Sequence, residues 1–149
     1  MSVTRVAVAE SDPELRPGSD AWSELVAELQ RTKPDLLVLN ELPFGPWLGA
    51  RERFDGAAWE ESMAEHEAGL AALPELGLPL VVGTRPADVD GRRCNQAFVW
   101  TPDAEPSSPH TKQHIPDSPG YRETTWTEPG RASFEVSEVG DLRVGFLIC

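Results

Sequence analysis

Three side chains with catalytic potential are spread along the 149-residue chain: a carboxylate at Glu41, an ammonium at Lys112 and a thiol at Cys149. Glu41 follows the apolar run LLVLN, at the place where the carboxyl end of a strand in an α/β sheet opens onto a ligand crevice. A carboxylate there loses water, so its pKa rises and it can act as a general base. The alternative is an ordinary solvated acid at the end of a strand.

Cys149 ends the apolar run LRVGFLI in the same way, so its thiol is also expected at a sheet edge. A cysteine becomes a nucleophile when a nearby base or cation lowers the pKa of its thiol. The alternative is a buried and inert cysteine, because a free cysteine packs as a small hydrophobic residue. Cys94 lies beside two arginines at the start of a strand, and we interpret it as structural.

Lys112 lies in PHTKQHIPDSPGY, a loop stiffened by prolines, in which an ammonium could be held as a fixed charge for a developing oxyanion. The alternative is an ordinary surface lysine. Glu123 and Glu128 follow in the same loop, and either could be an exposed acid. His110 and His114 do not predict a metal site, because their spacing brings ligands together only on a helix and the prolines exclude a helix here.

The elements that must position these side chains follow from the hydrophobic pattern. Strands are expected at residues 3–9, 36–39, 78–84 and 97–101, helices at residues 20–32 and 57–73, and a turn at residues 11–13. The first two strands and the first helix form a βαβ unit, whereas an Asp-Gly turn at residues 90–91 favours antiparallel pairing of the last two strands. Residues 102–130 are proline-rich and irregular, as functional loops often are.

The last part of the chain has the pattern of a closing hairpin, with strands at residues 133–139 and 142–149 around a Gly-Asp turn. The run LRVGFLIC predicts a fully buried strand, and such a strand needs neighbours on both edges. We therefore expect residues 1–149 to be the N-terminal part of a single larger domain, truncated at Cys149.

The composition narrows the class of partner. The 13 basic and 25 acidic residues give a net charge of −12 and a pI near 4.6. This charge argues against nucleic acid or an anionic membrane surface, because both require a basic face. No stretch reaches the ~18 apolar residues of a membrane span, and two cysteines are too few for a disulfide framework. The composition favours a cytoplasmic protein that binds a small molecule.

Three motifs in this order, LLVLNEL, HTKQHIPD and GFLIC, resemble those of the nitrilase (carbon–nitrogen hydrolase) superfamily, and NQAFVW is similar to the strand before its lysine loop. The resemblance implies an α/β fold, an αββα sandwich, of which this chain is about the first half. It also implies that Glu41 is the general base, Lys112 the oxyanion donor and Cys149 the nucleophile.

The loop HTKQHIPDSPGYRETTWTEPG is most similar to the carbamoyl-amide branch, especially the N-carbamoylputrescine amidases, although it departs from them at residues 124–127. This similarity implies that Glu123 is a second catalytic glutamate. The implied reaction is hydrolysis of a non-peptide carbon–nitrogen bond, in an amide or N-carbamoyl group, through a cysteine thioester. It requires no metal and no organic cofactor. We expect a small-molecule amide or carbamoyl partner and a homo-oligomer, with no nucleic acid or membrane partner.

A function of another class stays open beside the enzyme. The chain could be a non-catalytic fragment, or an interaction module, that keeps the first half of the fold with an incomplete active site. Intact mass separates the two, because the enzyme requires a gene product much longer than 149 residues.

Overall fold

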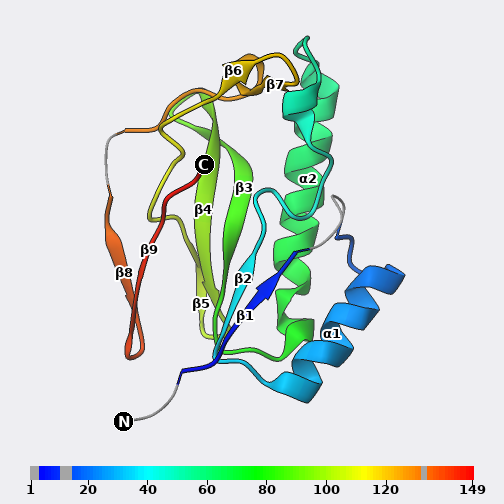
Figure 1. Cartoon of the computed structure of the whole chain (residues 1–149), viewed down its shortest axis with the longest axis vertical. Coiled ribbons are helices and arrows are strands. Elements are labelled where there is room, and N and C mark those ends of the chain that lie inside the picture. Colours follow the sequence, from blue (N-terminus) through cyan, green and yellow to red (C-terminus); the bar gives the residue numbers. More distant parts are fainter. Residues whose placement is uncertain (1–3, 11–14, 132–133) are drawn as a thin grey trace.

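In the computed structural model, which describes residues 4–10, 15–131 and 134–149, two long helices cover one face of a mixed sheet and a hairpin covers the other (Figure 1). The sheet has the strand order β1 (Val6–Ala9), β2 (Leu36–Leu39), β3 (Val81–Val89), β4 (Arg92–Thr101) and β5 (Ala104–Ser107). The first three strands are parallel, whereas β4 and β5 are each antiparallel to the preceding strand. Parallel strands need a crossover connection, and the helices supply it.

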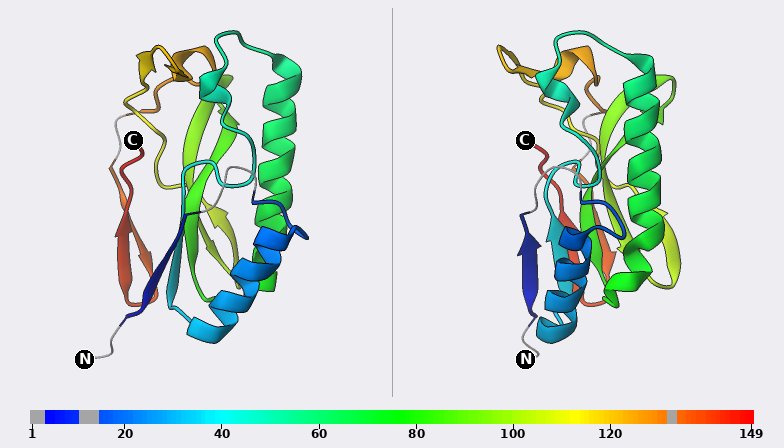
Figure 2. Two further views of the ribbon diagram at one scale, coloured as in Figure 1. Left: turned by 45° about the vertical axis from the view of Figure 1, so that its right-hand side comes forward. Right: turned by 90° about the vertical axis from the view of Figure 1, so that its right-hand side faces the viewer.

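The helical elements of this layer are α1 (Asp20–Thr32), α2 (Gly56–Ala72) and two 3-10 turns, η1 (Leu48–Ala50) and η2 (Leu73–Leu76). Helix α1 is capped by Ser19, whose hydroxyl oxygen accepts the Trp22 N–H at 3.1 Å. Helix α2 begins after Asp55, whose carboxylate accepts main-chain N–H groups of the first turn. Figure 2 shows both helices on the same face of the sheet, where Trp22, Leu70 and Phe98 belong to the main hydrophobic core.

The predicted βαβ unit is confirmed, with the helix at residues 20–32 and the strand at residues 36–39. The second helix and the third strand are also present, with shifted ends. β4 begins five residues before its predicted start, because the turn at Asp90 and Gly91, with φ of 52° and 76°, pairs β3 with β4 along their length. The predicted start of the first strand at residue 3 and the turn at residues 11–13 lie outside the described residues.

The other face of the sheet carries the hairpin of β8 (Val136–Val139) and β9 (Leu142–Gly145), which turns at Gly140. The predicted hairpin is confirmed, and residue 133, where its first strand was expected to begin, lies outside the described residues. Helices, sheet and hairpin stack in that order, and the hairpin is a separate two-stranded sheet. This layering matches the predicted α/β sandwich.

Within residues 1–149, the run LRVGFLIC is not a fully buried strand. The strand ends at Gly145, and the side chains of this run are alternately half-buried and exposed, with Leu147 exposed to 85%. The reason is that the hairpin packs by one face only, which presents Val144 and Phe146 to an apolar cluster on β2, β3 and β4. Within the described residues, β9 pairs with β8 alone.

The long segment after β5 is largely irregular, as predicted, but it carries three short elements. These are β6 (Asp117–Ser118), β7 (Tyr121–Arg122) and the 3-10 turn η3 (Glu123–Thr125). Figure 1 places β6 and β7 at the end of the sheet where β3 turns into β4, which is also the end toward which β1 and β2 run. No helix in the described part of the chain is both long and apolar enough to cross a membrane.

Candidate active site

The first candidate residue, Glu41, lies two residues beyond the end of β2. The backbone turns sharply there, because Leu42 has a left-handed φ of 49°. The Leu42 N–H donates to the Thr84 hydroxyl oxygen at 2.8 Å, which ties this turn to β3. Glu41 is therefore held at the end of the sheet with its side chain 25% exposed, and it is not a freely solvated acid.

Main-chain hydrogen bonds fix Lys112 beside β4. Its N–H donates to the Asn95 carbonyl oxygen at 2.8 Å, and its own carbonyl oxygen accepts the Gly130 N–H at 2.9 Å. The close approach of these two segments requires glycine at position 130, since a Cβ there would lie 2.9 Å from the Thr111 carbonyl oxygen. The Lys112 side chain is 0% exposed, so the alternative of a surface lysine is wrong.

Glu123 is the first residue of the turn η3, and its carbonyl oxygen accepts the two hydrogen bonds that close the turn. The N–H groups of Trp126 and Thr127 each donate to this oxygen at 2.8 Å. The buried Trp126 indole in turn donates to the Arg51 carbonyl oxygen at 3.0 Å, which anchors the turn. Glu123 is buried, whereas Glu128 is exposed, so of the two loop acids only Glu123 faces the interior.

The three polar side chains meet at the Lys112 ammonium. Lys112 Nζ donates to Glu41 Oε1 at 2.7 Å and to Glu123 Oε2 at 2.7 Å. A fourth residue joins them, because Asn95 Nδ2 donates to the same Glu41 Oε1 at 2.6 Å. Sequence reasoning assigned Asn95 only to a strand, and no local signal separates it from other polar residues in a strand.

The electrostatics of this cluster follow from burial and pairing. Burial raises the pKa of Glu41, although the hydrogen bonds from Lys112 and Asn95 oppose that rise. Burial by itself would lower the pKa of the Lys112 ammonium, but the hydrogen bonds to Glu123 and Glu41 outweigh it and the pKa lies above its usual value. Lys112 is therefore a cation at neutral pH, and Glu41 is a carboxylate with increased affinity for a proton.

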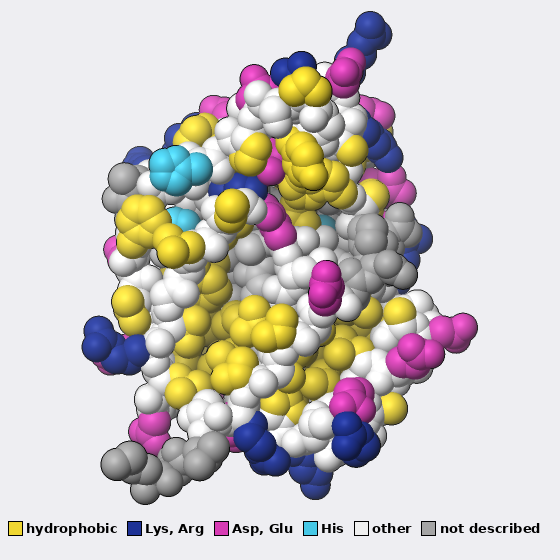
Figure 3. Space-filling view, viewed as in Figure 1, with side chains coloured by type: hydrophobic (Ala, Val, Ile, Leu, Met, Phe, Trp, Pro, Cys, Tyr) yellow, Lys and Arg dark blue, Asp and Glu magenta, His cyan; other side chains and the backbone are white. Residues whose placement is uncertain are grey.

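The candidate nucleophile lies across a pocket from this cluster. The pocket has a volume of about 300 Å³, opens between β2, β3 and the last six residues of the chain, and has both Glu41 and Cys149 in its lining. Its walls are mostly aliphatic, and Figure 3 shows apolar side chains gathered around β1 and β2 on this side of the molecule. Cys149 itself is exposed in this chain.

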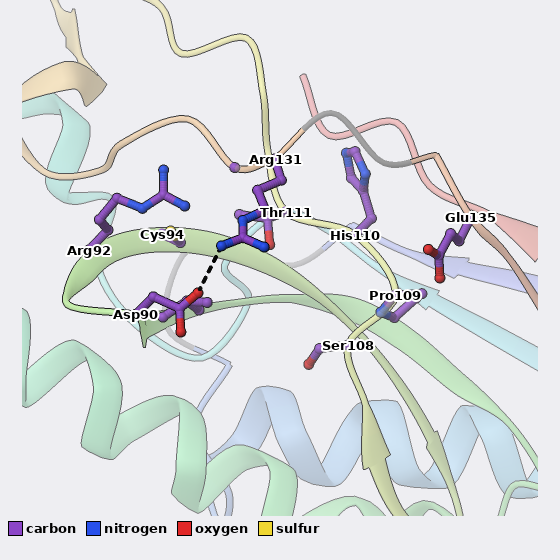
Figure 4. A pocket seen from close by; sticks show the side chains of 11 residues that line it. Asp90, Arg92, Cys94, Ser108, Pro109, His110, Thr111, Arg131 and Glu135 are labelled. Carbon is purple, nitrogen blue, oxygen red and sulfur yellow. Dashed lines mark ion pairs between the residues drawn. The ribbon is translucent and has the colours of Figure 1, made fainter.

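A second pocket, of about 280 Å³, lies where β3 turns into β4 and contains the other cysteine, Cys94 (Figure 4). Arg131 and Asp90 face each other across it at 3.8 Å, with both side chains largely exposed. Cys94 is buried, and burial raises the pKa of its thiol. A thiol of that kind is a poor nucleophile at neutral pH. His110 is buried and stacks on Phe134, whereas His114 is exposed.

Many solved structures resemble this fold over almost the whole chain, among them the following three. A carbon-nitrogen hydrolase from Helicobacter pylori has 24% identity and a TM-score of 0.71, with 98% of this chain and 52% of that chain covered. A glutamine-dependent NAD+ synthetase from Acinetobacter baumannii, in complex with ADP, has 21% identity and a TM-score of 0.73, with coverages of 98% and 27%. An amidase mutant from Nesterenkonia sp. AN1, whose active-site cysteine carries the acetamide moiety of fluoroacetamide, has 15% identity and a TM-score of 0.69, with coverages of 98% and 55%.

The chain therefore has the nitrilase fold and spans about half the length, or less, of the solved structures that it matches. No curated protein matches it by sequence. Residues 5–149 match the family described as carbon-nitrogen hydrolase. Because this match extends from the strand β1 to Cys149, the chain belongs to the carbon-nitrogen hydrolase family.

Proposed function

We propose that the full-length protein hydrolyses a non-peptide carbon–nitrogen bond, in an amide or an N-carbamoyl group, through a thioester on Cys149. The observation that supports this most is the buried Lys112 ammonium, which lies 2.7 Å from a carboxylate oxygen on each of two sides. Family membership supplies the type of reaction, and this cluster supplies a fixed cation and a base for it. In this proposal residues 1–149 are the N-terminal part of a single hydrolase domain.

The first step is transfer of the Cys149 thiol proton to Glu41, after which the thiolate attacks the carbonyl carbon of the substrate. Before the transfer, two carboxylates share one ammonium. After it, Glu41 is neutral and Lys112 stays paired with Glu123 alone. Glu123 thus prevents the buried ammonium from losing its only counter-charge during the reaction, which would be costly in a buried site.

Attack by sulfur converts the carbonyl oxygen into an oxyanion, and Lys112 is its donor. An ammonium has three N–H groups, and Glu41 and Glu123 accept one each. The third N–H is available for the developing negative charge. Since the two carboxylates hold the ammonium in place before the substrate arrives, little reorganisation is needed when the charge appears.

The second half of the reaction returns the enzyme to its starting state. Glu41 gives its proton to the substrate nitrogen, the carbon–nitrogen bond breaks, and ammonia or an amine leaves. The acyl group stays on the Cys149 sulfur as a thioester. Glu41 then takes a proton from water, the hydroxide attacks the thioester carbon, and the Cys149 thiolate leaves and recovers a proton from Glu41. The products are the amine and the corresponding acid.

For the substrate we propose an N-carbamoyl compound rather than a nitrile. The loop from residue 116 to Glu123 is similar to the carbamoyl-amide branch, and a buried carboxylate accepts hydrogen bonds from N–H groups, which a linear nitrile lacks. In the Nesterenkonia amidase the acetamide moiety of fluoroacetamide is bound covalently to the active-site cysteine, which supports a nucleophilic cysteine sulfur in this fold.

Alkylation by iodoacetamide tests the nucleophile. In the full-length protein we expect Cys149 to react faster than the buried Cys94, as measured by mass spectrometry after limited labelling. Cys149→Ala abolishes hydrolysis, and Cys94→Ala serves as the matched control that keeps it. Faster labelling of Cys94, with activity retained in Cys149→Ala, would show that the nucleophile lies elsewhere.

Kinetics of Lys112→Ala test the oxyanion donor. Loss of one donor lowers kcat by ~100-fold or more with a smaller change in KM, because the lost interaction belongs to the transition state. An effect on KM alone would make Lys112 a binding residue.

A substrate panel tests the substrate class. Ammonia release is followed with N-carbamoyl amines, N-carbamoyl amino acids, aliphatic amides and nitriles, and carbamoyl compounds are expected to lead. Turnover of nitriles or simple amides without carbamoyl activity would reject the carbamoyl branch and leave the thioester mechanism in place. Absence of turnover with all four classes would favour a non-catalytic role.

A further inference from the structure

The residue that the proposed mechanism leaves without a role is Asn95, in the middle of β4. Its side chain is 1% exposed, and its Nδ2 donates to Glu41 Oε1 at 2.6 Å. Lys112 Nζ donates to the same oxygen at 2.7 Å. Both hydrogen bonds that the described residues make to this carboxylate therefore converge on Oε1, which leaves Oε2 as the oxygen that can receive a proton.

Asn95 is also bonded to the second member of the cluster through its main chain. Its carbonyl oxygen accepts the Lys112 N–H at 2.8 Å, so one residue of β4 holds both the base and the ammonium. Because β4 pairs with β3 along most of its length, this support is rigid. Glu41 and Lys112 are 71 residues apart in the chain, and Asn95 is a direct link between the two segments.

The orientation of the amide is dictated by the carboxylate. An amide oxygen placed against Glu41 Oε1 would face a second acceptor, so the amide nitrogen must occupy that side. The amide oxygen then lies on the opposite side, and Oδ1 is buried without a hydrogen-bond partner among the described residues. A buried acceptor without a hydrogen-bond partner lowers the stability of the fold. The hydrogen bond from Asn95 Nδ2 to Glu41 is retained in spite of this loss of stability.

We propose that Asn95 is a positioning residue for the general base, which together with Lys112 occupies Oε1 of Glu41 so that the proton of Cys149 is received on Oε2. This inference rests on the proposed function. The charged groups that act on Glu41 are Lys112 and Glu123, and Cys149 lines the same pocket. A residue that merely filled the core would affect stability but would not determine the pH at which Glu41 ionises.

The test follows the alkylation of Cys149 by iodoacetamide as a function of pH in the full-length protein, so it needs no substrate. Asn95→Leu removes the donor at similar volume, and Asn95→Asp replaces it with a second carboxylate. Both variants should move the acidic limb of the profile to higher pH, by about one to two units for Asn95→Leu, because a carboxylate has lost one hydrogen bond. In Glu41→Gln, adding Asn95→Leu should change the remaining rate little.

Val99→Ala is the matched control, because Val99 is a buried residue of the same strand that packs in the apolar cluster under the hairpin and is not part of the pocket lining. It should lower the melting temperature without moving the acidic limb. If Asn95→Leu does not fold, the nearly isosteric Asn95→Asp carries the test. An unmoved acidic limb in the Asn95 variants, with only a lower melting temperature, would overturn the positioning role.

Failure of the proposed function gives a different result. In that case Cys149 of the wild-type protein would react no faster than a thiol of the unfolded chain, and its profile would show no acidic limb to move. A fast reaction of the wild-type protein, together with an acidic limb that does not move in the Asn95 variants, would overturn only the inference about Asn95.

Discussion

The buried ammonium makes a sharp prediction about stability. Lys112 is 0% exposed and lies 2.7 Å from Glu41 Oε1 and 2.7 Å from Glu123 Oε2, so these two oxygens are at most twice 2.7 Å apart. Lys112→Met keeps most of the apolar stem and removes the charge, which leaves two carboxylates together. Removing one partner of a buried ion pair typically costs about 3–5 kcal/mol.

The loss should depend on pH, and its sign follows from proton binding. Without the cation, the pKa of Glu41 in the folded variant rises further above its ordinary value of 4.5. The folded variant then binds more protons than its unfolded state, so its stability decreases as pH rises. The pKa of Lys112 is raised in the wild type, so its own contribution is constant below pH 10 and is lost only in strong alkali.

Urea unfolding at pH 5 and pH 8 measures the effect in the full-length protein. We expect the free energy of unfolding to fall by about 3–5 kcal/mol at pH 8, and by at least about 1.4 kcal/mol less at pH 5, which is the value of one pKa unit. Adding Glu123→Gln to Lys112→Met should restore part of the stability at pH 8. Equal losses at both pH values, with no recovery in the double variant, would refute the electrostatic reasoning.

The chain offers a matched control, because Lys33 is its only other lysine. Lys33 ends α1 and is exposed, so Lys33→Met makes the same change in net charge without uncovering a buried carboxylate. It should change the free energy of unfolding by only a few tenths of a kcal/mol, about equally at pH 5 and pH 8.

Two further perturbations test other parts of the fold. Burial lowers the pKa of His66 to about 4, so the wild-type protein should lose about 3 kcal/mol of stability as pH falls from 6.5 to 4. Urea titrations at the two pH values measure this loss, and it should be absent in His66→Gln. Gly130→Ala places a Cβ against Thr111, so it should lower the free energy of unfolding by about 1–3 kcal/mol and reduce the rate of Cys149 alkylation. Gly56→Ala should do neither, because its Cβ would only make an ordinary contact with the Phe54 ring at 3.8 Å.

The elements of the first half of the fold could be predicted because their signals are local. Helix α1 has a serine cap and an apolar stripe, and β2 is a short apolar run between prolines. The last strand differs from its expected burial within residues 1–149 for an equally physical reason. Leu147 is apolar and exposed, so the alternation of a half-buried strand is hidden and the run has the composition of a buried one.

The sequence predicted the individual residues Glu41, Lys112 and Glu123, but it did not predict the hydrogen bonds that join them. The three contacts of the cluster join residues 71, 11 and 54 positions apart, so tertiary structure determines that they meet. The pairing of β4 places Asn95 and Lys112, and the turn η3 places Glu123. The sequence signal for Glu41 was the end of a strand, and for Lys112 it was a motif. Neither signal contains the register of β4, on which the role of Asn95 depends.

One physical requirement would nevertheless have pointed to part of the missing set. A lysine that leaves water is stable only when carboxylates replace its hydration, so placing Lys112 inside the fold demands acids within hydrogen-bond distance. The motif supplied Glu123, and the strand end supplied Glu41. No comparable demand exists for Asn95, because a carboxylate paired with an ammonium is already compensated in charge. The Asn95 N–H group determines which of the two Glu41 oxygens accepts hydrogen bonds, and only the atomic positions in the structure show this.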